Sequence, residues 1–136
     1  CYITLHVGIG TFKPILEKDI RNHQMDFEYY EIPNETVDVI KSSKRIIAVG
    51  TTTTRTLEFW NFDQNPRSGW TNLFIYPGYK FRVINGLITN FHLPKSTPLL
   101  LVSAFLGDFE KLKQAYVIAQ KMKYRFYSYG DAMLII

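Results

Sequence analysis

The sequence predicts an α/β domain, with a layered sheet and flanking helices. Runs rich in β-forming residues alternate with runs of helical periodicity, and this alternation is typical of α/β folds. Residues 45–50, RIIAVG, form a nearly continuous apolar run, as expected of a strand buried on both faces of a parallel sheet. The length of 136 residues corresponds to about one domain. We therefore predict a single α/β domain over residues 1–136.

The first half of the chain contains strand and helix signals in alternation. Stretches of β-branched and aromatic residues predict strands at residues 2–7, 28–33 and 45–50. After the second of these, residues 34–44 have the pattern of a short helix with Asn34 as its N-cap. The third strand ends at Gly50, and residues 51–60, TTTTRTLEFW, are predicted to turn directly into a helix.

The second half begins with a loop and ends with two helices and a strand. Residues 61–70 have loop composition, and residues 71–91 predict two or three short strands with turns at PG and NG. A buried helix is expected from residue 97, with Pro98 in its first turn and Gly107 as its stop. The next helix is predicted to have Asp108 as N-cap and one apolar face, formed by Phe109, Leu112, Tyr116 and Ala119. The segment YSYGDAMLII predicts a closing strand.

Composition limits the class of protein without identifying its partner. The net charge of +4 is spread along the chain, which fits a solvated basic surface or a nucleic-acid footprint. The apolar runs are far shorter than the roughly 20 residues of a membrane span. The single cysteine, Cys1, excludes an internal disulfide and suits a reducing compartment. We expect a cytoplasmic protein without a metal, and the start at Cys1 suggests an excised piece of a longer chain.

The turn AVGTTTTR is the first candidate site. A buried strand that ends in Gly and leads into a helix leaves the first backbone N–H groups of that helix pointing outward. Here they would lie beside the hydroxyls of Thr51 to Thr54, with Thr51 and Thr52 as the binding candidates, and beside the charge of Arg55. Such a turn suits a carboxylate or phosphate. The alternative is a Thr-capped helix in which Arg55 pairs with Glu58.

Two further segments near the N-terminus carry polar groups. In HVGIGTF, Gly8 and Gly10 beside His6 would let a ligand approach the backbone, although the same glycines can serve a turn that needs positive φ. In HQMDFEYY, Asp26 and Glu28 would share one face of an extended segment. A paired carboxylate can act as a base, and the alternative is a solvated turn. The spacing with the neighbouring histidine matches no metal pattern.

Residues 87–101, GLITNFHLPKSTPLL, place four polar side chains and two prolines in an apolar run. If GLIT is a buried strand, the following loop lies at its C-terminal end, where ligands bind in open α/β sheets. Asn90, His92, Lys95 and Ser96 would then face a ligand. His92 is a candidate catalytic residue, because histidine exchanges protons most readily near neutral pH. The alternative is a loop whose polar groups satisfy their own backbone.

Residues 124–133, YRFYSYGDAM, combine aromatic and charged groups. Tyr127 and Tyr129 could stack on a base, with Arg125 contributing a cation. Asp131, in the same segment, is the second candidate catalytic residue. The alternative is that these tyrosines simply fill the core.

Taken in order, these segments resemble a known family. HVGIGTFKP, AVGTTTTRTLE, LFIYPGYKFRVINGLITNFHLPKST, LLLVSAF and YRFYSYGDAMLI look like the C-terminal part of the S-adenosylmethionine:tRNA ribosyltransferase-isomerases of queuosine biosynthesis. The likeness covers nearly the whole chain and implies the larger α/β domain of that family. Its N-terminal part, with a β-barrel domain, is absent, so this chain is expected to hold half a site. Where the family commonly has His, this sequence has Asp26.

The resemblance also implies an activity. Such enzymes transfer the ribosyl group of S-adenosylmethionine to 7-aminomethyl-7-deazaguanine in tRNA and isomerise it to an epoxycyclopentane, releasing adenine and methionine. A base must remove a proton from the ribose carbon beside the sulfonium. S-adenosylmethionine is a consumed substrate, so no cofactor is expected. The implied partners are this donor and the modified tRNA, and the runner-up function is a non-catalytic α/β module that binds an anion or nucleotide.

Overall fold

The computed structural model describes residues 1–8, 10 and 14–136. The HVGIGTF motif therefore lies partly outside the described residues. The elements, in chain order, are β1 (Thr4–His6), the short 3-10 helix η2 (Ile20–Asn22), β2 (Glu28–Glu31), α1 (Asn34–Ser42), β3 (Ile47–Val49), α2 (Thr51–Trp60), β4 (Ser68–Thr71), β5 (Gly86–Asn90), α3 (Thr97–Leu106), α4 (Phe109–Lys121) and β6 (Ala132–Ile135).

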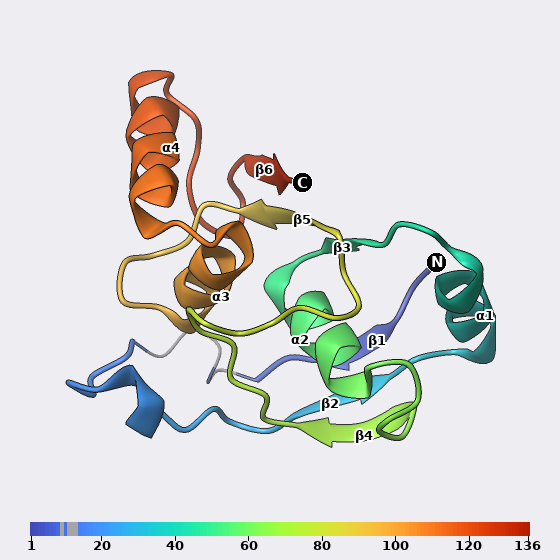
Figure 1. The fold of residues 1–136 in the computed structure, drawn as a ribbon. Helices are drawn as coiled ribbons and strands as arrows, with labels where there is room; N and C mark the ends of the chain where they lie inside the picture. Colours follow the sequence, from blue (N-terminus) through green and yellow to red (C-terminus); the bar gives the residue numbers. More distant parts are fainter. Residues whose placement is uncertain (9, 11–13) are drawn as a thin grey trace.

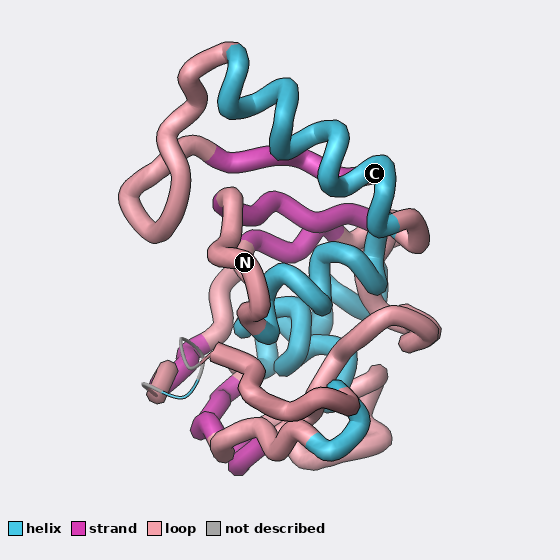
Figure 2. The backbone as a smooth tube through the Cα atoms, turned by 90° about the vertical axis from the view of Figure 1, so that its left-hand side faces the viewer, coloured by secondary structure: helices cyan, strands magenta, loops and turns pink. Residues whose placement is uncertain are grey.

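The strands form two small sheets with helices between them (Figure 1). One sheet is antiparallel with the order β1-β2-β4; in the other, of order β3-β5-β6, β3 is parallel to β5 and β6 is antiparallel to it. Figure 2 shows the same layers from the side, with α2 and α3 between the sheets. The α/β class predicted from the sequence is confirmed, with two sheets in place of the expected single one.

The passage from β3 to α2 creates the best-defined turn of the fold. Gly50 has φ 92° and ψ 149°, a conformation that is open almost only to glycine. Its N–H donates to the carbonyl of Ile88 in β5 (2.8 Å), and its carbonyl accepts from the N–H of Thr54 (3.1 Å). Gly50 thus ends the strand and begins the helix, as predicted.

Strand β3 is not buried on both faces. Ala48 is buried, but Ile47 and Val49 on either side of it are 43% and 64% exposed. The prediction of a strand covered on both faces was therefore wrong, although the parallel pairing with β5 is confirmed. Only one face of this strand packs against a helix, α2.

The caps of α3 and α4 follow from local sequence. Ser96 accepts a hydrogen bond from the N–H of Leu99, Pro98 lies in the first turn of α3, and Gly107 ends the helix at φ 74°. Asp108 caps α4 by accepting from the N–H of Lys111. Leu112 and Ala119 are buried as predicted, whereas Phe109 is exposed, because it lies at the first residue of α4, where the helix leaves α3.

The core lies between the sheets and the two central helices. Its largest fully buried side chains come from both sheets, from α2, α3 and α4, and from the segment before β5; they include Trp60, Tyr30, Ile32, Ile75, Leu87, Leu101 and Leu112. The carboxylate of Glu58, also buried, accepts from the backbone N–H groups of Arg82, Val83 and Ile84 at 2.9 to 3.0 Å. This carboxylate holds the irregular segment before β5 against α2.

Three local predictions were wrong. Asn34 does not cap α1, because Pro33 occupies the cap position and the Asn34 side chain accepts a hydrogen bond from Arg67. Residues 68–70, predicted as part of a loop, form β4 together with Thr71, and β4 pairs with β2. Residues 72–85 form no named strand, because the N–H groups of 82–84 bind Glu58 rather than a neighbouring strand.

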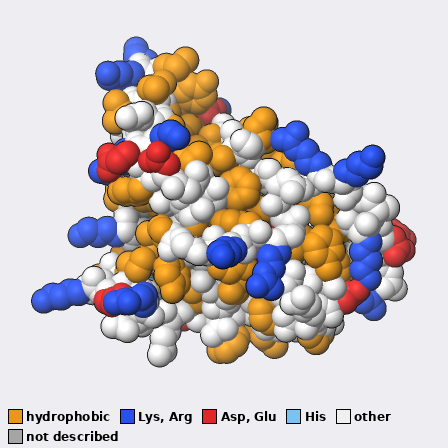
Figure 3. All heavy atoms as spheres, in the orientation of Figure 1, with side chains coloured by type: hydrophobic (Ala, Val, Ile, Leu, Met, Phe, Trp, Pro, Cys, Tyr) orange, Lys and Arg blue, Asp and Glu red, His pale blue; other side chains and the backbone are white. Residues whose placement is uncertain are grey.

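The surface matches the charge distribution of the sequence. Lys and Arg side chains are scattered over the face in Figure 3, with apolar side chains between them, and form no continuous block. No helix among the described residues is long and apolar enough to cross a membrane. Charge alone therefore does not mark a binding face.

Candidate functional site

A cavity of about 370 Å³ lies where the end of β1, the start of α2, the loop after β5 and residues 127–128 meet. Its volume is in the range of small-molecule sites. These segments are far apart in the sequence, and the fold brings them to one place. Several residues predicted from sequence line this cavity, namely Thr51, Thr52, Asn90, His92, Ser96 and Tyr127.

The first turn of α2 forms one wall. Gly50 and Thr51–Thr53 line the cavity, and the helix has no side-chain cap at its N-terminus. The first N–H groups of an α-helix have no partner within the helix and carry its positive dipole end. The start of α2 thus forms part of the cavity wall, and binding of an anion there, expected from the turn AVGTTTTR, stays a prediction.

His92 lies on the loop after β5 and is held by two neighbours. Its Nε2 is 2.8 Å from Oγ1 of Thr89, and its backbone N–H donates to the hydroxyl of Tyr116 at 2.9 Å. Burial lowers the pKa of His92 to about 4, so its imidazole is neutral at pH 7. A neutral imidazole at the cavity wall can accept a proton or a hydrogen bond.

The side chains of Asn90 and Ser96 line the cavity and also form hydrogen bonds with backbone groups. The Asn90 amide donates to the carbonyls of Gly130 and Asp131, both at 3.3 Å. The Ser96 hydroxyl caps α3 and donates to the carbonyl of Leu93 at 2.7 Å. The alternative of a loop whose polar groups satisfy their own backbone thus describes part of their role. Lys95 is exposed at φ 57° and does not line the cavity.

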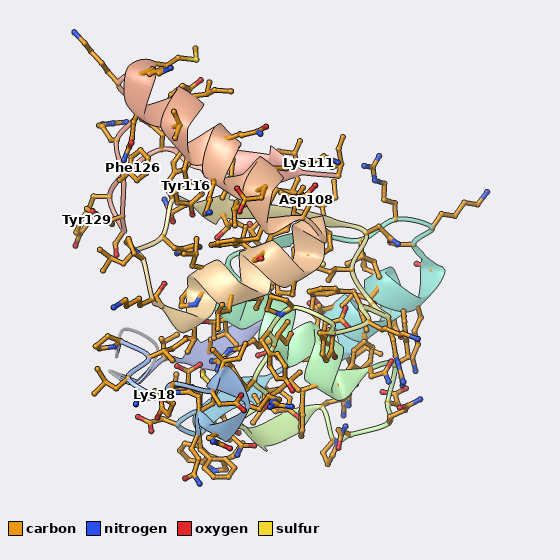
Figure 4. All side chains as sticks on the ribbon, turned by 60° about the vertical axis from the view of Figure 1, so that its left-hand side comes forward. Lys18, Asp108, Lys111, Tyr116, Phe126 and Tyr129 are labelled. Atoms are coloured by element: carbon orange, nitrogen blue, oxygen red, sulfur yellow. The ribbon has the colours of Figure 1, made fainter. Side chains whose placement is uncertain are left out.

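The segment between α4 and β6 closes on itself beside the cavity. Asp131 binds the side chain and the backbone N–H of Arg125, both at 2.8 Å, and the Asp131 N–H returns to the Arg125 carbonyl. Phe126 stacks on Phe91 at 4.7 Å, and Figure 4 shows it between α4 and the sheet, near Tyr116. The loop therefore has a fixed shape.

Within that loop the predicted residues take different positions. Tyr127, at φ 71°, lines the cavity, and its N–H donates to the carbonyl of Phe91 (3.0 Å). Tyr129 is 98% exposed (Figure 4). Asp131 does not line the cavity, and its ion pair with Arg125 holds its pKa below the usual range. The catalytic role of Asp131 stays a prediction that this geometry does not favour.

Arg55 lies in the interior, contrary to its predicted place at the ligand surface. Its guanidinium forms an ion pair with Glu28, and both side chains are more than nine-tenths buried. Burial lowers the pKa of Arg55 to about 10, so it remains charged at neutral pH. Arg55 does not pair with Glu58, whose carboxylate binds the backbone N–H groups of Val83 and Ile84 instead. The predicted pairing with Glu58 is wrong, and a role of Arg55 in ligand binding stays a prediction that its burial does not favour.

The described glycines of the HVGIGTF motif lie close to the carboxylates of Asp26 and Glu28. The Gly8 N–H donates to Oε1 of Glu28 at 3.3 Å, and a Cβ at Gly10 would overlap the Asp26 side chain. His6 is exposed and packs edge-on against Tyr29. His6, Gly8 and Gly10 do not line the cavity. The described residues contain no group of three or more side chains suited to a metal ion.

Two residues of the site were not predicted. Thr89 lines the cavity beside His92, and Tyr116 holds the backbone of His92. Glu28 was predicted as half of a paired carboxylate with Asp26, whereas the structure pairs it with Arg55. The contacts of Tyr116 and Glu28 are distant in sequence, so no local pattern indicates them.

Comparison with known proteins gives the family. A family model described as queuosine biosynthesis protein matches residues 1–135. The chain is 55% identical to the S-adenosylmethionine:tRNA ribosyltransferase-isomerase of Caldanaerobacter subterraneus subsp. tengcongensis and 54% identical to that of Staphylococcus haemolyticus, in each case over 99% of this chain and 41% of the relative. It thus spans well under half the length of these relatives.

A solved structure agrees in fold. The S-adenosylmethionine tRNA ribosyltransferase from Thermotoga maritima superposes with a TM-score of 0.71 at 47% identity, covering 80% of this chain and 41% of the other. On these grounds the chain belongs to the family of queuosine biosynthesis proteins.

Proposed function

We propose that this chain forms part of an S-adenosylmethionine:tRNA ribosyltransferase-isomerase. The whole enzyme would transfer the ribosyl moiety of S-adenosylmethionine to 7-aminomethyl-7-deazaguanine in tRNA and isomerise it to give epoxyqueuosine, releasing adenine and methionine. The observation that carries the proposal is the cavity of about 370 Å³, because the start of α2, the loop after β5 and residues 127–128, which all belong to segments that resemble the family, meet there. The names of the relatives support the same activity.

The start of α2 would bind an anionic group. Its free amides and the hydroxyls of Thr51 and Thr52 suit a carboxylate or a phosphate oxygen. The carboxylate of the methionine part of the donor and a phosphate of the tRNA are the two groups with this chemistry. Either would lie against the same wall.

His92 would accept the proton in the proposed reaction. It lines the cavity, it is neutral at pH 7, and Thr89 and Tyr116 fix its position. A base must be deprotonated and positioned before it can act, and the same burial that keeps His92 deprotonated makes it a weaker base than an ordinary histidine. The sulfonium of the donor acidifies the adjacent ribose carbon, which lowers the basicity that His92 must supply.

Aromatic residues at the cavity rim would receive a base. Tyr127 lies in the wall, Tyr129 is exposed two residues further on, and Arg125 is fixed beside them by Asp131. Stacking on such residues is worth about 1–3 kcal/mol per base. We propose that this loop contacts the adenine of the donor or a base of the tRNA. S-adenosylmethionine is consumed, so the proposal includes no cofactor, and a tRNA-modifying enzyme of this kind would act in the cytoplasm.

Calorimetric titration tests the proposal. Purified chain is titrated with S-adenosylmethionine and, separately, with inorganic phosphate at the same ionic strength. We expect heat of binding that is specific to S-adenosylmethionine, because the cavity offers apolar and aromatic contacts as well as an anion site. Equal binding of phosphate alone would instead favour the second candidate, a non-catalytic anion-binding module that uses the start of α2.

A further inference from the structure

The buried carboxylate of Glu28 connects two walls of the cavity. Oε1 accepts from the N–H of Gly8, and Oε2 pairs with the guanidinium of Arg55. Gly8 directly follows Val7, which lines the cavity, and Arg55 lies one turn after the threonines that form the α2 wall. Glu28 itself begins β2, the central strand of its sheet.

The placement of this ion pair differs from that of an ordinary surface pair. Both side chains are more than nine-tenths buried, so water screens the interaction little. The charged hydrogen bond fixes the orientation of the guanidinium relative to the carboxylate. One carboxylate thus sets the distance between a loop that leaves β1 and the helix α2 that follows β3. The strands β1 and β3, from which the loop and the helix continue, belong to different sheets.

We propose that Glu28 and Arg55 are positioning residues for the cavity: together they hold the wall at Val7–Gly8 and the wall at Thr51–Thr53 at the separation that the ligand requires. The inference rests on the proposed function, since the ligand is the S-adenosylmethionine named there. Neither residue lines the cavity, so both act through the backbone that they hold.

A structural role alone predicts something different. If the pair only contributes stability, replacing both partners with apolar side chains of similar size restores the fold, as is often found for buried ion pairs. The cavity would be restored with it. If the pair positions the walls, apolar contacts restore the stability of the fold. They do not restore the position of the Val7–Gly8 wall relative to the Thr51–Thr53 wall, and the cavity stays altered.

Three variants separate these cases. Glu28→Gln keeps the shape but loses the charge, and the double variant Glu28→Leu with Arg55→Met replaces the whole pair with apolar groups. Glu58→Gln is the matched control, because Glu58 is also a buried carboxylate, lies on α2 close to Arg55, and binds backbone N–H groups away from the cavity. Thermal melting of each variant measures global stability.

Hydrogen exchange reports on the walls without any ligand. The amides to follow are those of Gly8 and of Thr54, whose N–H donates to the Gly50 carbonyl. In the double variant the Gly8 amide loses its acceptor through the substitution itself, so the Thr54 amide decides between the two cases. We expect the Thr54 amide to exchange about tenfold faster or more than in the wild type, although the melting temperature of the double variant exceeds that of Glu28→Gln. In Glu58→Gln the exchange rates of these two amides should rise no more than the exchange rates of the core amides.

Affinity for S-adenosylmethionine completes the test. We expect the dissociation constant to rise about tenfold or more in both pair variants and to stay unchanged in Glu58→Gln. A double variant with wild-type exchange at Thr54, or with wild-type affinity, would overturn the inference. A wild-type chain that does not bind S-adenosylmethionine would refute the proposed function, and the exchange rates would still decide whether the pair positions the walls.

Discussion

At the scale of single residues, His92 couples the site to pH. Burial lowers its pKa to about 4 in the folded chain, against roughly 6.5 for an unfolded histidine. The unfolded state therefore binds the proton first as the pH falls. The contribution to stability is present above pH 6.5 and is lost between pH 6.5 and 4, to a total of at most about 3 kcal/mol.

This pH dependence can be measured directly. Urea unfolding of the wild type and of His92→Gln is compared at pH 4.5, 5.5, 6.5 and 7.5. We expect the wild type to lose more unfolding free energy than the variant below pH 6.5, while the difference between the two proteins stays constant above it. Parallel curves over the whole range would mean that His92 is protonated in the folded state as easily as in the unfolded one.

Tyr116 controls the same loop from α4. Its hydroxyl oxygen accepts the hydrogen bond of the His92 N–H, and the ring packs edge-on against Phe91. Tyr116→Phe keeps the ring and removes the acceptor, so we expect it to lower the unfolding free energy by about 1–2 kcal/mol. The matched control is Tyr124→Phe, at an exposed position, for which chemical denaturation should give a change near zero. Equal effects would show that the His92 N–H finds another acceptor.

Arg55 shows what sequence reasoning can and cannot reach at this scale. The sequence predicts that Arg55, in the first turns of a helix after a Gly-terminated strand, binds an anion or pairs with Glu58. Its partner was sought at Glu58, three residues away, because helical spacing is the only geometry that a sequence gives directly. The true partner, Glu28, is 27 residues distant and comes from another sheet, so only the tertiary fold could indicate it.

At the scale of elements, the turn between β3 and α2 depends on glycine. Gly50 has φ 92° and Gly78, in the turn after Pro77, has φ 103°. Alanine at either position is expected to cost about 1–3 kcal/mol of stability, because both conformations are strained for a residue with a Cβ. The two sites differ in position, since Gly50 lines the cavity and Gly78 does not.

This difference makes the two glycines a matched pair. We expect Gly50→Ala to weaken binding of S-adenosylmethionine in calorimetry, because the turn positions the amides of Thr51–Thr53, and Gly78→Ala to leave the affinity unchanged at a similar loss of melting temperature. Should both variants bind as the wild type does, the start of α2 would not be part of the ligand site.

The elements that the sequence predicted well are those with local signals. The caps at Asp108 and the stop at Gly107 were correctly predicted, because a cap depends on residues within one turn of it. β4 was missed, because its residues pair with β2 about forty positions earlier. The segment 72–85 was assigned strands for its aromatic residues, but its backbone donors bind Glu58, a contact that propensity does not show.

At the scale of the whole molecule, the class was predictable and the layout was not. Alternation of strand and helix signals indicates α/β, but it does not tell whether six short strands form one sheet or two. The cavity was predicted in part, because its polar residues lie in loops at strand ends. Residues 127–128 reach the same cavity because β6 pairs antiparallel with β5. This pairing joins segments distant in sequence, so no local pattern predicts it.

The last prediction concerns activity of the 136-residue chain alone, which we expect to be catalytically silent toward tRNA carrying 7-aminomethyl-7-deazaguanine. The chain spans 41% of the length of its curated relatives. Holding two substrates in reactive geometry is demanding, since a misplacement of about 1 Å can cost roughly a hundredfold in rate. The cavity is lined by the start of α2, the neutral His92 and Tyr127, and we expect these few groups to hold a small ligand without aligning a tRNA.

The assay follows release of adenine by chromatography after incubation with S-adenosylmethionine and the modified tRNA. The S-adenosylmethionine tRNA ribosyltransferase from Thermotoga maritima, which this chain resembles over 41% of its length, is the positive control. We expect no adenine above background from the 136-residue chain, even where calorimetry shows that it binds the donor. Turnover close to that of the control would place the complete catalytic machinery within these residues, since binding alone cannot release adenine, and would make His92 the first residue to substitute.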